Sequence, residues 1–370
     1  MANPQATCKL FLSDCHISAG WGLEGSDKAK PHPWEWFSAA DQARLKAFLA
    51  WAGQRPDIDE FVLLGDIWDN WIFPHDIKPP TFSELLLSAN AAFFVQALNG
   101  LCKNSSVIWV PGNHDLTISA AVLNSVLPGV IVAGPGQANP YFSWGRLRAE
   151  HGHSHCLFNA PDPLRPGELP LGYFVSRIVA TADRQTGNHT PSIAQEVSEI
   201  EKVIANKEDL AQGVLDAVCA KAGVGQDAVI QMPNDLWGGV ATTVGYVRNL
   251  YKNLYQEWEN RNGTGSALVA IAAELNQLSA IAIKIFLQGG VNAMVMGHTH
   301  EATTDQYSTV LFGNRIYANT GGWCNNVPTA CWAEAVKSPN GGLTLTVYGC
   351  KGVDSSGKPI VAQLLAPVQT

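Results

Sequence analysis

The amino-acid sequence predicts a layered α/β domain that is interrupted by a mostly helical insertion. Two patterns carry this prediction. Short apolar runs alternate with helix-like segments over the first 150 residues, and helical spacing replaces that alternation from about residue 192. The chain has 370 residues, of which 46% are hydrophobic. That is enough apolar material for one large domain with an insertion, or for two domains.

The first part of the chain reads as alternating strands and helices. Each expected strand is an apolar run that ends at polar or glycine residues, and each expected helix has apolar residues three or four positions apart. The strands are 8–12, 61–64, 107–110 and 146–150, and the helices are 39–51 and 82–101. This order predicts a largely parallel sheet.

The second part begins with helices and returns to strands. Helical spacing covers 192–222, 242–258 and 267–287, and strands are expected at 291–296, 308–311, 315–318, 330–335 and 343–348. We therefore predict one main domain formed by residues 1–155 and 291–370. Residues 156–290 form the helical insertion, or cap.

Charge and cysteine content exclude several classes of protein. Only 15% of the residues are charged and the formal net charge is -8, so a binder of nucleic-acid polymers is not expected. We expect no secretory signal and no membrane span, since no apolar run is long enough. The eight cysteines form no CxxC pair, which favours free thiols and a cytoplasmic location over a zinc ribbon.

Five short motifs rich in His, Asp and Asn each follow an expected strand. Ligands bind beyond the carboxyl ends of strands in open α/β sheets, so these motifs are expected to meet in one crevice. A lone histidine is more often a core or surface residue than a ligand, and each motif alone is a weak signal. The motifs are D-C-H at 14–16, G-D-I-W-D at 65–69, G-N-H-D at 112–115, H-G-H at 151–153 and G-H-T-H at 297–300.

The mixture of imidazole, carboxylate and amide groups favours a transition metal or zinc over calcium. Mn, Zn, Fe and Ni all remain open. A carboxylate such as Asp66 can bridge two cations. The glycines before Asp66, Asn113 and His298 are expected to permit close approach of the ligands.

In their order and composition, the five motifs resemble those of the calcineurin-like metallophosphoesterase superfamily. The resemblance implies a layered β-sandwich flanked by helices, and it covers roughly residues 8–155 and 291–335. It also implies two divalent metal ions that share Asp66. The first metal would be held by Asp14, His16, Asp66 and His300, and the second by Asp66, Asn113, His151 and His298.

The same resemblance assigns two further residues to catalysis. His114 would lie beside the scissile phosphate as a proton donor or charge stabiliser, and Asp115 would orient it. Asp69 is expected to be a structural residue or to support a ligand. Within the H-G-H-S-H run at 151–155, the pattern favours His151 as the ligand, with His153 and His155 as alternates.

The expected chemistry is attack on phosphorus by a hydroxide that bridges the two metals. No motif for a serine nucleophile or a P-loop is present. The substrate is expected to be a small phosphorylated molecule, and a phosphodiesterase or pyrophosphohydrolase is preferred. A phosphomonoesterase, including a protein phosphatase, is the alternative, and an inactive metal-binding scaffold is a third hypothesis. The sequence leaves the oligomeric state open.

Tryptophans near the motifs are candidates for substrate contact, although core packing is the default for each of them. They are Trp21, Trp68, Trp71 and Trp323. The position of the helical insertion, between the fourth and fifth motifs, resembles that in bacterial UDP-2,3-diacylglucosamine pyrophosphohydrolases. In this chain the insertion is longer.

Overall fold

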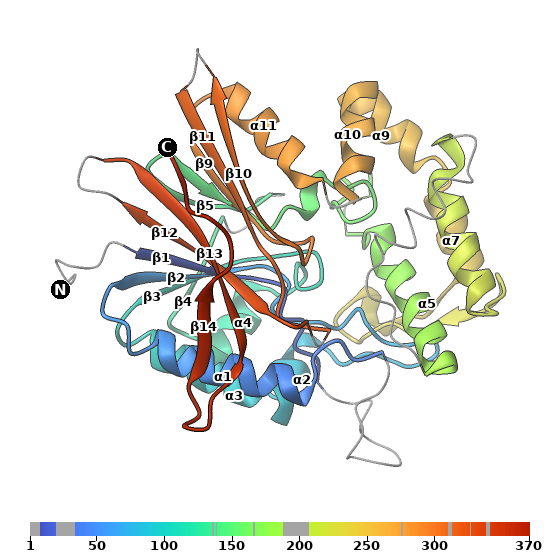
Figure 1. Cartoon of the computed structure of the whole chain (residues 1–370). Helices are drawn as coiled ribbons and strands as arrows, with labels where there is room; N and C mark the ends of the chain where they lie inside the picture. The colour runs from blue at the N-terminus through green and yellow to red at the C-terminus, as the bar shows by residue number, and fades with distance from the viewer. Residues whose placement is uncertain are drawn as a thin grey trace.

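The computed structural model describes most of the chain. The described residues are 8–19, 34–134, 137, 139–165, 167–187, 207–274, 277–309, 313–325, 327–337 and 341–370. Trp21 and the first half of the helix expected at 192–222 lie outside them. Figure 1 shows two sheets packed together, with helices on the outside and a separate group of helices to one side.

The larger sheet has eight strands, in the order β14-β13-β12-β1-β2-β3-β4, with β15 paired to β13. Strands β1 to β4 run parallel, while β12 pairs antiparallel with β1, and β13 pairs antiparallel with β12, β14 and β15. The strands are β1 (Cys8–Leu12), β2 (Ile58–Leu64), β3 (Ser106–Val110), β4 (Val130–Val132), β12 (Ala330–Lys337), β13 (Leu343–Val353), β14 (Pro359–Gln363) and β15 (Val368–Gln369).

The smaller sheet has five strands, in the order β10-β11-β9-β6-β5. Strand β9 is parallel to both β6 and β11, and the two outer pairs are antiparallel. The expectation of a largely parallel sheet therefore holds for β1 to β4 of the larger sheet and for β6, β9 and β11 of the smaller one, and not for the other strands. The strands are β5 (Phe142–Trp144), β6 (Leu147–Ala149), β9 (Ala293–Met296), β10 (Ala302–Thr309) and β11 (Gly313–Thr320).

Apolar side chains between the two sheets form the centre of a β-sandwich. Phe11, Val62, Leu64, Val295 and Val347 belong to this layer and are fully buried. Four helices cover the outer face of the larger sheet, and α11 covers the smaller one. The expectation of a layered sandwich flanked by helices is confirmed. These helices are α1 (Ala39–Ala52), α2 (Phe82–Leu86), α3 (Ala89–Leu101), α4 (Ala120–Val126) and α11 (Leu278–Gln288).

The segment between β6 and β9, two strands of the smaller sheet, is mainly helical in its described residues and has an apolar core of its own. Its described residues also include the short strands β7 (Val229–Ile230) and β8 (Thr242–Thr243) and short 3-10 turns. The boundaries 156–290 remain a prediction. The helices are α5 (Leu171–Thr186), α7 (Leu210–Lys221), α8 (Val244–Leu250), α9 (Leu254–Asn262) and α10 (Thr264–Glu274).

A buried arginine ties this helical segment to the loop after β2. Arg177 of α5 is fully buried and donates hydrogen bonds to the backbone oxygens of Phe73, Pro74 and Ile77, at 2.7, 2.9 and 2.6 Å. A buried guanidinium is tolerated only when its donors are satisfied. The loop that follows the second motif is therefore fixed against the insertion.

Several expected helices are broken in the structure. The helix expected at 82–101 is two helices, because Ser88 caps α3 by accepting a hydrogen bond from the backbone N–H of Ala91. The segments expected at 242–258 and 267–287 also each contain two helices. Apolar spacing predicted the helical character of these segments but not the breaks.

Candidate metal centre

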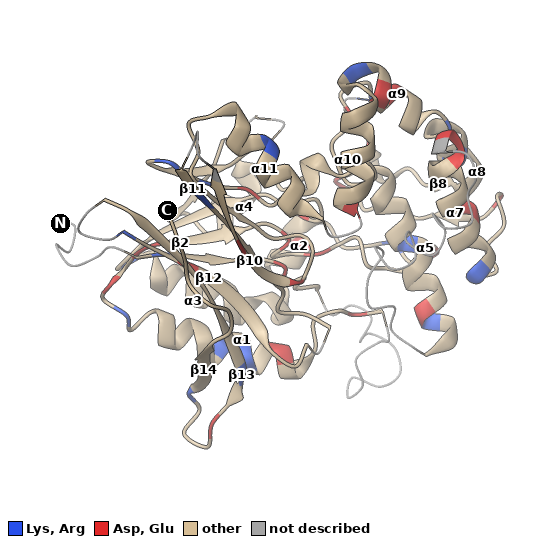
Figure 2. Cartoon of the chain, turned by 45° about the horizontal axis from the view of Figure 1, so that its top comes forward, with Lys and Arg blue, Asp and Glu red and all other residues tan. Residues whose placement is uncertain are grey.

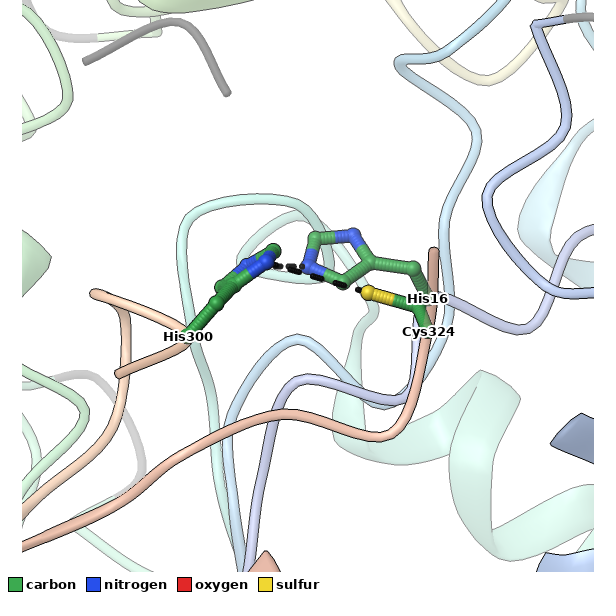
Figure 3. Close-up of side chains that lie close together, drawn as sticks. All are labelled: His16, His300 and Cys324. Atoms are coloured by element: carbon green, nitrogen blue, oxygen red, sulfur yellow. Dashed lines mark hydrogen bonds between the residues drawn. The ribbon is translucent and has the colours of Figure 1, made fainter. Parts of the chain in front are cut away.

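The first motif and the last one meet at a pair of histidines. Nε2 of His16 lies 3.1 Å from Nε2 of His300, and His300 Nε2 lies 3.4 Å from Oδ1 of Asp14. Asp66 Oδ2 is 3.8 Å from His16 Nε2. Figure 3 shows the two histidine side chains approaching each other, with Cys324 beside them. Four side chains predicted to hold the first metal therefore face one small space.

The second predicted set gathers on the other side of Asp66. His151 Nε2 lies 3.1 Å from Asp66 Oδ2, and these two side chains and His298 each offer a ligand atom within 4.8 Å of the others. Asn113 is 1% exposed, and its Oδ1 has no hydrogen-bond partner in the part of the chain that the structure describes. Asp66 belongs to both groups, as a bridging carboxylate would.

Backbone strain is concentrated in these residues. In the described part of the chain, seven non-glycine residues have positive φ angles, and five of them are predicted ligands. Such a conformation is uncommon outside glycine and costs about 1–3 kcal/mol per residue, so it persists where the surrounding structure enforces it. The five ligands are Asp14 (φ 53°), His16 (50°), Asp66 (53°), His298 (73°) and His300 (58°).

The glycines of three motifs leave room for the ligands, as predicted. A Cβ atom on Gly65 would lie 2.5 Å from Nδ1 of His151, and one on Gly112 would lie 2.2 Å from Oδ1 of Asp66. A Cβ on Gly297 would lie 2.7 Å from a carboxylate oxygen of Asp14. All three distances are shorter than van der Waals contact, so any larger residue would displace a ligand.

Asp69 orients two histidines at once. Its Oδ2 accepts a hydrogen bond of 2.7 Å from Nδ1 of His16 and lies 3.0 Å from Nδ1 of His114. Its Oδ1 accepts from the backbone N–H groups of Trp71 and Ile72, at 2.7 and 3.2 Å. Since Nδ1 of His16 donates to this carboxylate, its Nε2 is left unprotonated for a cation. The expected supporting role of Asp69 agrees with this geometry.

Asp115 does not contact His114, contrary to the expected orienting role. Its oxygens accept from the backbone N–H groups of Gly112 and Ile67, at 2.7 and 3.0 Å, and from Nε1 of Trp109 at 3.4 Å. The carboxylate therefore holds the third motif's turn to the second motif. The family resemblance assigned the orienting role to Asp115, but its carboxylate faces the backbone of its own turn and of the second motif.

Burial and neighbouring charged groups shift the pKa values of the acidic and histidine side chains in the centre. Burial by itself raises the pKa of Asp66, but His151, His114 and His16 outweigh it and hold that pKa well below its usual value. Burial likewise lowers the pKa of His151, while Asp66 raises it to about 9. Burial also raises the pKa of Asp69, and His114 and His16 reverse that effect. The carboxylates are thus ionised and carry negative charge into a buried site.

The donor atoms suit divalent cations. Histidine nitrogens bound to one zinc lie about 2.0–2.1 Å from it, so two such nitrogens come within roughly 3–3.5 Å of each other. His16 and His300 show this spacing. His151 donates from Nδ1 to the backbone oxygen of Leu64 at 2.8 Å, so Nε2, which faces Asp66, is the nitrogen that would bind a cation in place of its proton. One cation in each set would satisfy these atoms, and the donor types fit Mn, Zn, Fe or Ni.

The two alternate histidines of the fourth motif lie differently from His151. His155 is held by Glu150, with Nε2 2.6 Å from Oε1. His153 is buried, its Nδ1 makes no hydrogen bond among the described residues, and its ring centroid is 5.4 Å from that of His151. Among the described residues, neither His153 nor His155 lies in a group of potential metal ligands that includes Asp66. The geometry favours His151.

The predicted substrate tryptophans lie mostly in the core. Trp68 and Trp323 are fully buried within the layer between the larger sheet and its helices, so as placed they offer no surface to a substrate. Trp71 is also buried, and its ring stacks on His114 with centroids 4.3 Å apart. Trp21 lies outside the described residues. Core packing, the default for each, explains Trp68 and Trp323.

Two cysteines near the centre were not expected as possible ligands. Cys324 Sγ lies 3.8 Å from Nδ1 of His300 and forms a possible ligand group with His300 and His16. Cys156 forms another with Glu274 and His298. Cys324 follows a strand, as the predicted ligands do. This position was the feature of the sequence that could have marked Cys324 as a possible ligand. All eight cysteines are free thiols.

No helix among the described residues has both the length and the apolarity needed to cross a membrane. Figure 2 shows the basic residues of the described part of the chain spread over several elements.

Comparison with known proteins finds one similar family. The sequence model of the calcineurin-like phosphoesterases matches residues 10–182, a range that contains the first four motifs. Among solved structures, the chain is similar to a metallophosphoesterase from Sphaerobacter thermophilus, with 11% sequence identity and a TM-score of 0.30. That comparison covers 90% of this chain and 84% of the other. No curated protein matches the chain significantly. Over residues 10–182, the chain is therefore similar to the calcineurin-like phosphoesterases.

Proposed function

We propose that the chain is a dinuclear metal-dependent phosphoester hydrolase that acts on small phosphodiesters or pyrophosphates. Metal-dependent phosphoester hydrolysis is the activity of the matched family. The observation that carries the proposal is the meeting of five separate motifs around the buried carboxylate of Asp66. Ligand atoms that follow strands of both sheets converge there.

The proposed ligands divide into two sets that share Asp66. Bound cations would supply positive charge to the phosphate oxygens and make a coordinated water acidic enough to attack phosphorus near neutral pH. The first set is Asp14, His16, Asp66 and His300, and the second is Asp66, Asn113, His151 and His298. A binuclear site of Mn, Zn, Fe or Ni is compatible with these donors.

His114 is the proposed proton donor to the leaving oxygen. Its side chain is 5% exposed, Nδ1 lies 3.0 Å from Asp69, and the ring is stacked on Trp71. Burial lowers the pKa of His114, but Asp69 and Asp66 raise it above its usual value. The two carboxylates therefore favour the protonated imidazole, and the contacts with Asp69 and Trp71 hold its ring in one orientation.

A cavity next to the third motif suits the non-reacting part of a small substrate. It has a volume of about 600 Å³ and is lined by Leu116 and Thr117, which directly follow the motif, and by Leu169 and Trp237 of the insertion. Its wall is largely apolar, and small-molecule sites commonly have such walls and volumes. This favours a substrate with an apolar or nucleotide part. The UDP-2,3-diacylglucosamine pyrophosphohydrolase branch remains a prediction, as does a cytoplasmic location.

Hydrolysis of two model substrates tests the proposal. The purified chain, loaded in turn with Mn²⁺, Zn²⁺, Fe²⁺ and Ni²⁺, is assayed with bis-p-nitrophenyl phosphate and with p-nitrophenyl phosphate. We expect the diester to be hydrolysed with the higher kcat/KM. Hydrolysis of the monoester alone would instead support the alternative, a phosphomonoesterase such as a protein phosphatase. Binding of metal without any hydrolysis would support an inactive scaffold.

A further inference from the structure

The helical insertion contacts the centre through the amide of Asn113. Its Nδ2 donates a hydrogen bond of 3.1 Å to Oδ1 of Asn159, and both residues are buried. The remaining amide atom, Oδ1 of Asn113, has no hydrogen-bond partner among the described residues. An amide that turns its nitrogen to one partner leaves its oxygen for the other side. The hydrogen bond to Asn159 therefore determines that Asn113 presents its side-chain oxygen, and not its nitrogen, to a cation.

Glu274, the last residue of α10, in turn determines the orientation of the side-chain amide of Asn159. One carboxylate oxygen of Glu274 accepts from the backbone N–H groups of Phe158 and Asn159, and the other accepts from Nδ2 of Asn159 at 3.0 Å. Backbone donors cannot be reversed, and the carboxylate of Glu274, whose pKa burial raises to about 7, only accepts when it is ionised. Asn159 must therefore turn its nitrogen to Glu274 and its oxygen to Asn113.

We propose that Glu274 and Asn159 are positioning residues that keep the side-chain oxygen of Asn113 turned toward the second cation. The inference rests on the proposed function, since it assumes that Asn113 is a ligand. Each member of this chain of hydrogen bonds has one orientation that satisfies its neighbours. Two residues of the insertion thereby set the ligand atom of a residue in the main domain.

The position of Glu274 gives independent support. A carboxylate at the C-terminal end of a helix faces the negative end of the helix dipole, and burial adds a further penalty. Glu274 is subject to both penalties, because it lies at the C-terminal end of α10 and is only 6% exposed. A neutral residue would suit helix α10 better. The carboxylate is explained by its three donors around Asn159 rather than by the stability of its own helix.

Gly172 provides the space that Asn159 occupies. A Cβ atom on Gly172 would lie 2.3 Å from Oδ1 of Asn159. Gly172 is in the first turn of α5, where its φ angle is one that other residues adopt, and alanine favours helices more than glycine does. The glycine is therefore explained by the close approach of Asn159 and not by the backbone conformation.

Glu274→Gln tests the proposal directly. The glutamine oxygen keeps the two backbone hydrogen bonds, so its nitrogen faces the nitrogen of Asn159. Asn159 and then Asn113 must reverse, which turns a nitrogen toward the second cation. We expect the affinity for the second Mn²⁺ to fall roughly 10- to 100-fold, with the first unchanged, in calorimetric titration of the full chain.

A double variant provides the rescue. In Asn159→Asp with Glu274→Gln, the carboxylate moves from one position to the other and the net charge is conserved. The glutamine nitrogen then donates to one oxygen of the relocated carboxylate, and the other oxygen accepts from Nδ2 of Asn113. We expect wild-type stoichiometry of two Mn²⁺ per chain by elemental analysis. A purely structural role for Glu274 gives no reason for this recovery.

Two further variants separate the relay from general damage to the insertion. Glu257→Gln removes an ion pair of 2.6 Å with Arg165 in the same helical segment and should leave two Mn²⁺ bound. Gly172→Ala leaves Glu274 intact and favours the helix, but displaces Asn159, and should weaken the second Mn²⁺. This variant gives the answer even if Glu274→Gln does not fold.

The outcomes are distinct. Loss of the second Mn²⁺ in Glu274→Gln or Gly172→Ala, with recovery in the double variant, supports the relay. Wild-type affinity in both single variants, or a double variant that stays impaired, overturns it while leaving the proposed function intact. A wild-type chain that binds none of Mn²⁺, Zn²⁺, Fe²⁺ and Ni²⁺ overturns both.

Discussion

Asp66 and His114 illustrate the difference between holding a cation and moving a proton. The carboxylate of Asp66 lies 3.1 Å from one proposed ligand and 3.8 Å from another, whereas His114 is held by Asp69 and Trp71. Removing the charge of Asp66 should therefore affect both cations. Removing the imidazole of His114 should leave the ligands in place.

Asp66→Asn is expected to lose both metal ions and all activity. His114→Ala should keep the ions and lower kcat by roughly 10²–10⁴-fold, since it removes one proton donor. Elemental analysis together with a diester assay measures both effects. A fully loaded and active Asp66→Asn variant would contradict the bridging role, and a metal-free His114→Ala variant would make His114 a ligand.

A second prediction concerns the substitution of Gly112. A Cβ atom would lie 2.2 Å from Oδ1 of Asp66 and 2.5 Å from its backbone nitrogen, so Gly112→Ala must displace the proposed bridging residue. We expect metal content and activity to fall together. Gly100→Ala is the matched control, because no atom lies within 4 Å of its Cβ position and the site is inside helix α3. Unchanged metal content in both variants would refute the close approach.

The strands that carry motifs could be predicted from the sequence because they are buried on both faces. β1, β3 and β9 are mainly apolar, with Lys9 and Ser106 as their only polar residues, and a proposed ligand follows within three residues of the end of each strand. Strand β10, in contrast, reads ATTDQYST and lies at the edge of its sheet, so its apolar pattern is weak. Helix α5 and the short strands β4, β5, β14 and β15 were likewise not predicted.

The ligand set could be proposed from motif order, but the supporting contacts could not. Asp69, Asn159 and Glu274 act through contacts with residues 45 to 116 positions away along the chain, and spacing carries no information about such pairs. Asp115 shows the same limit, since its neighbour in sequence is not its partner. Local patterns predict strands and motifs, whereas orientation depends on tertiary packing.

The contact between the loop after β2 and helix α5 is expected to weaken in acid. His75 lies against Thr181, with Nδ1 3.0 Å from its hydroxyl oxygen. Burial lowers the pKa of His75, Asp76 opposes this, and Arg184 and Arg177 add to it. Because the folded pKa lies below the unfolded value of about 6.5, this stability is present above pH 6.5 and is lost as pH falls through the folded pKa.

The measurement is Tm between about pH 7.5 and pH 5 for the wild-type chain and for His75→Gln, a range that spans the unfolded pKa. The neutral variant should lose less stability over this range. Parallel Tm curves would assign the acid sensitivity to other groups.

The molecule as a whole is expected to depend on its cations for stability. Ionised carboxylates and several imidazoles are buried together at the junction of the two sheets, and cations would balance that charge. A ligand that binds only the folded state at about 100 times its Kd adds about 2.7 kcal/mol. Removal of metal with a chelator should therefore lower Tm by several degrees, and added Mn²⁺ should restore it. Scanning calorimetry with and without chelator checks this, and an unchanged Tm would argue against resident cations.

Crystals grown with Mn²⁺ and measured for anomalous scattering give the decisive observation. Two peaks about 3.5–4 Å apart are predicted, one on each side of the Asp66 carboxylate. The first should contact Asp14, His16 and His300, and the second Asn113, His151 and His298. A single ion, or ions bound elsewhere with Asp66 uncoordinated, would contradict the proposed centre and the hydrolysis that depends on it.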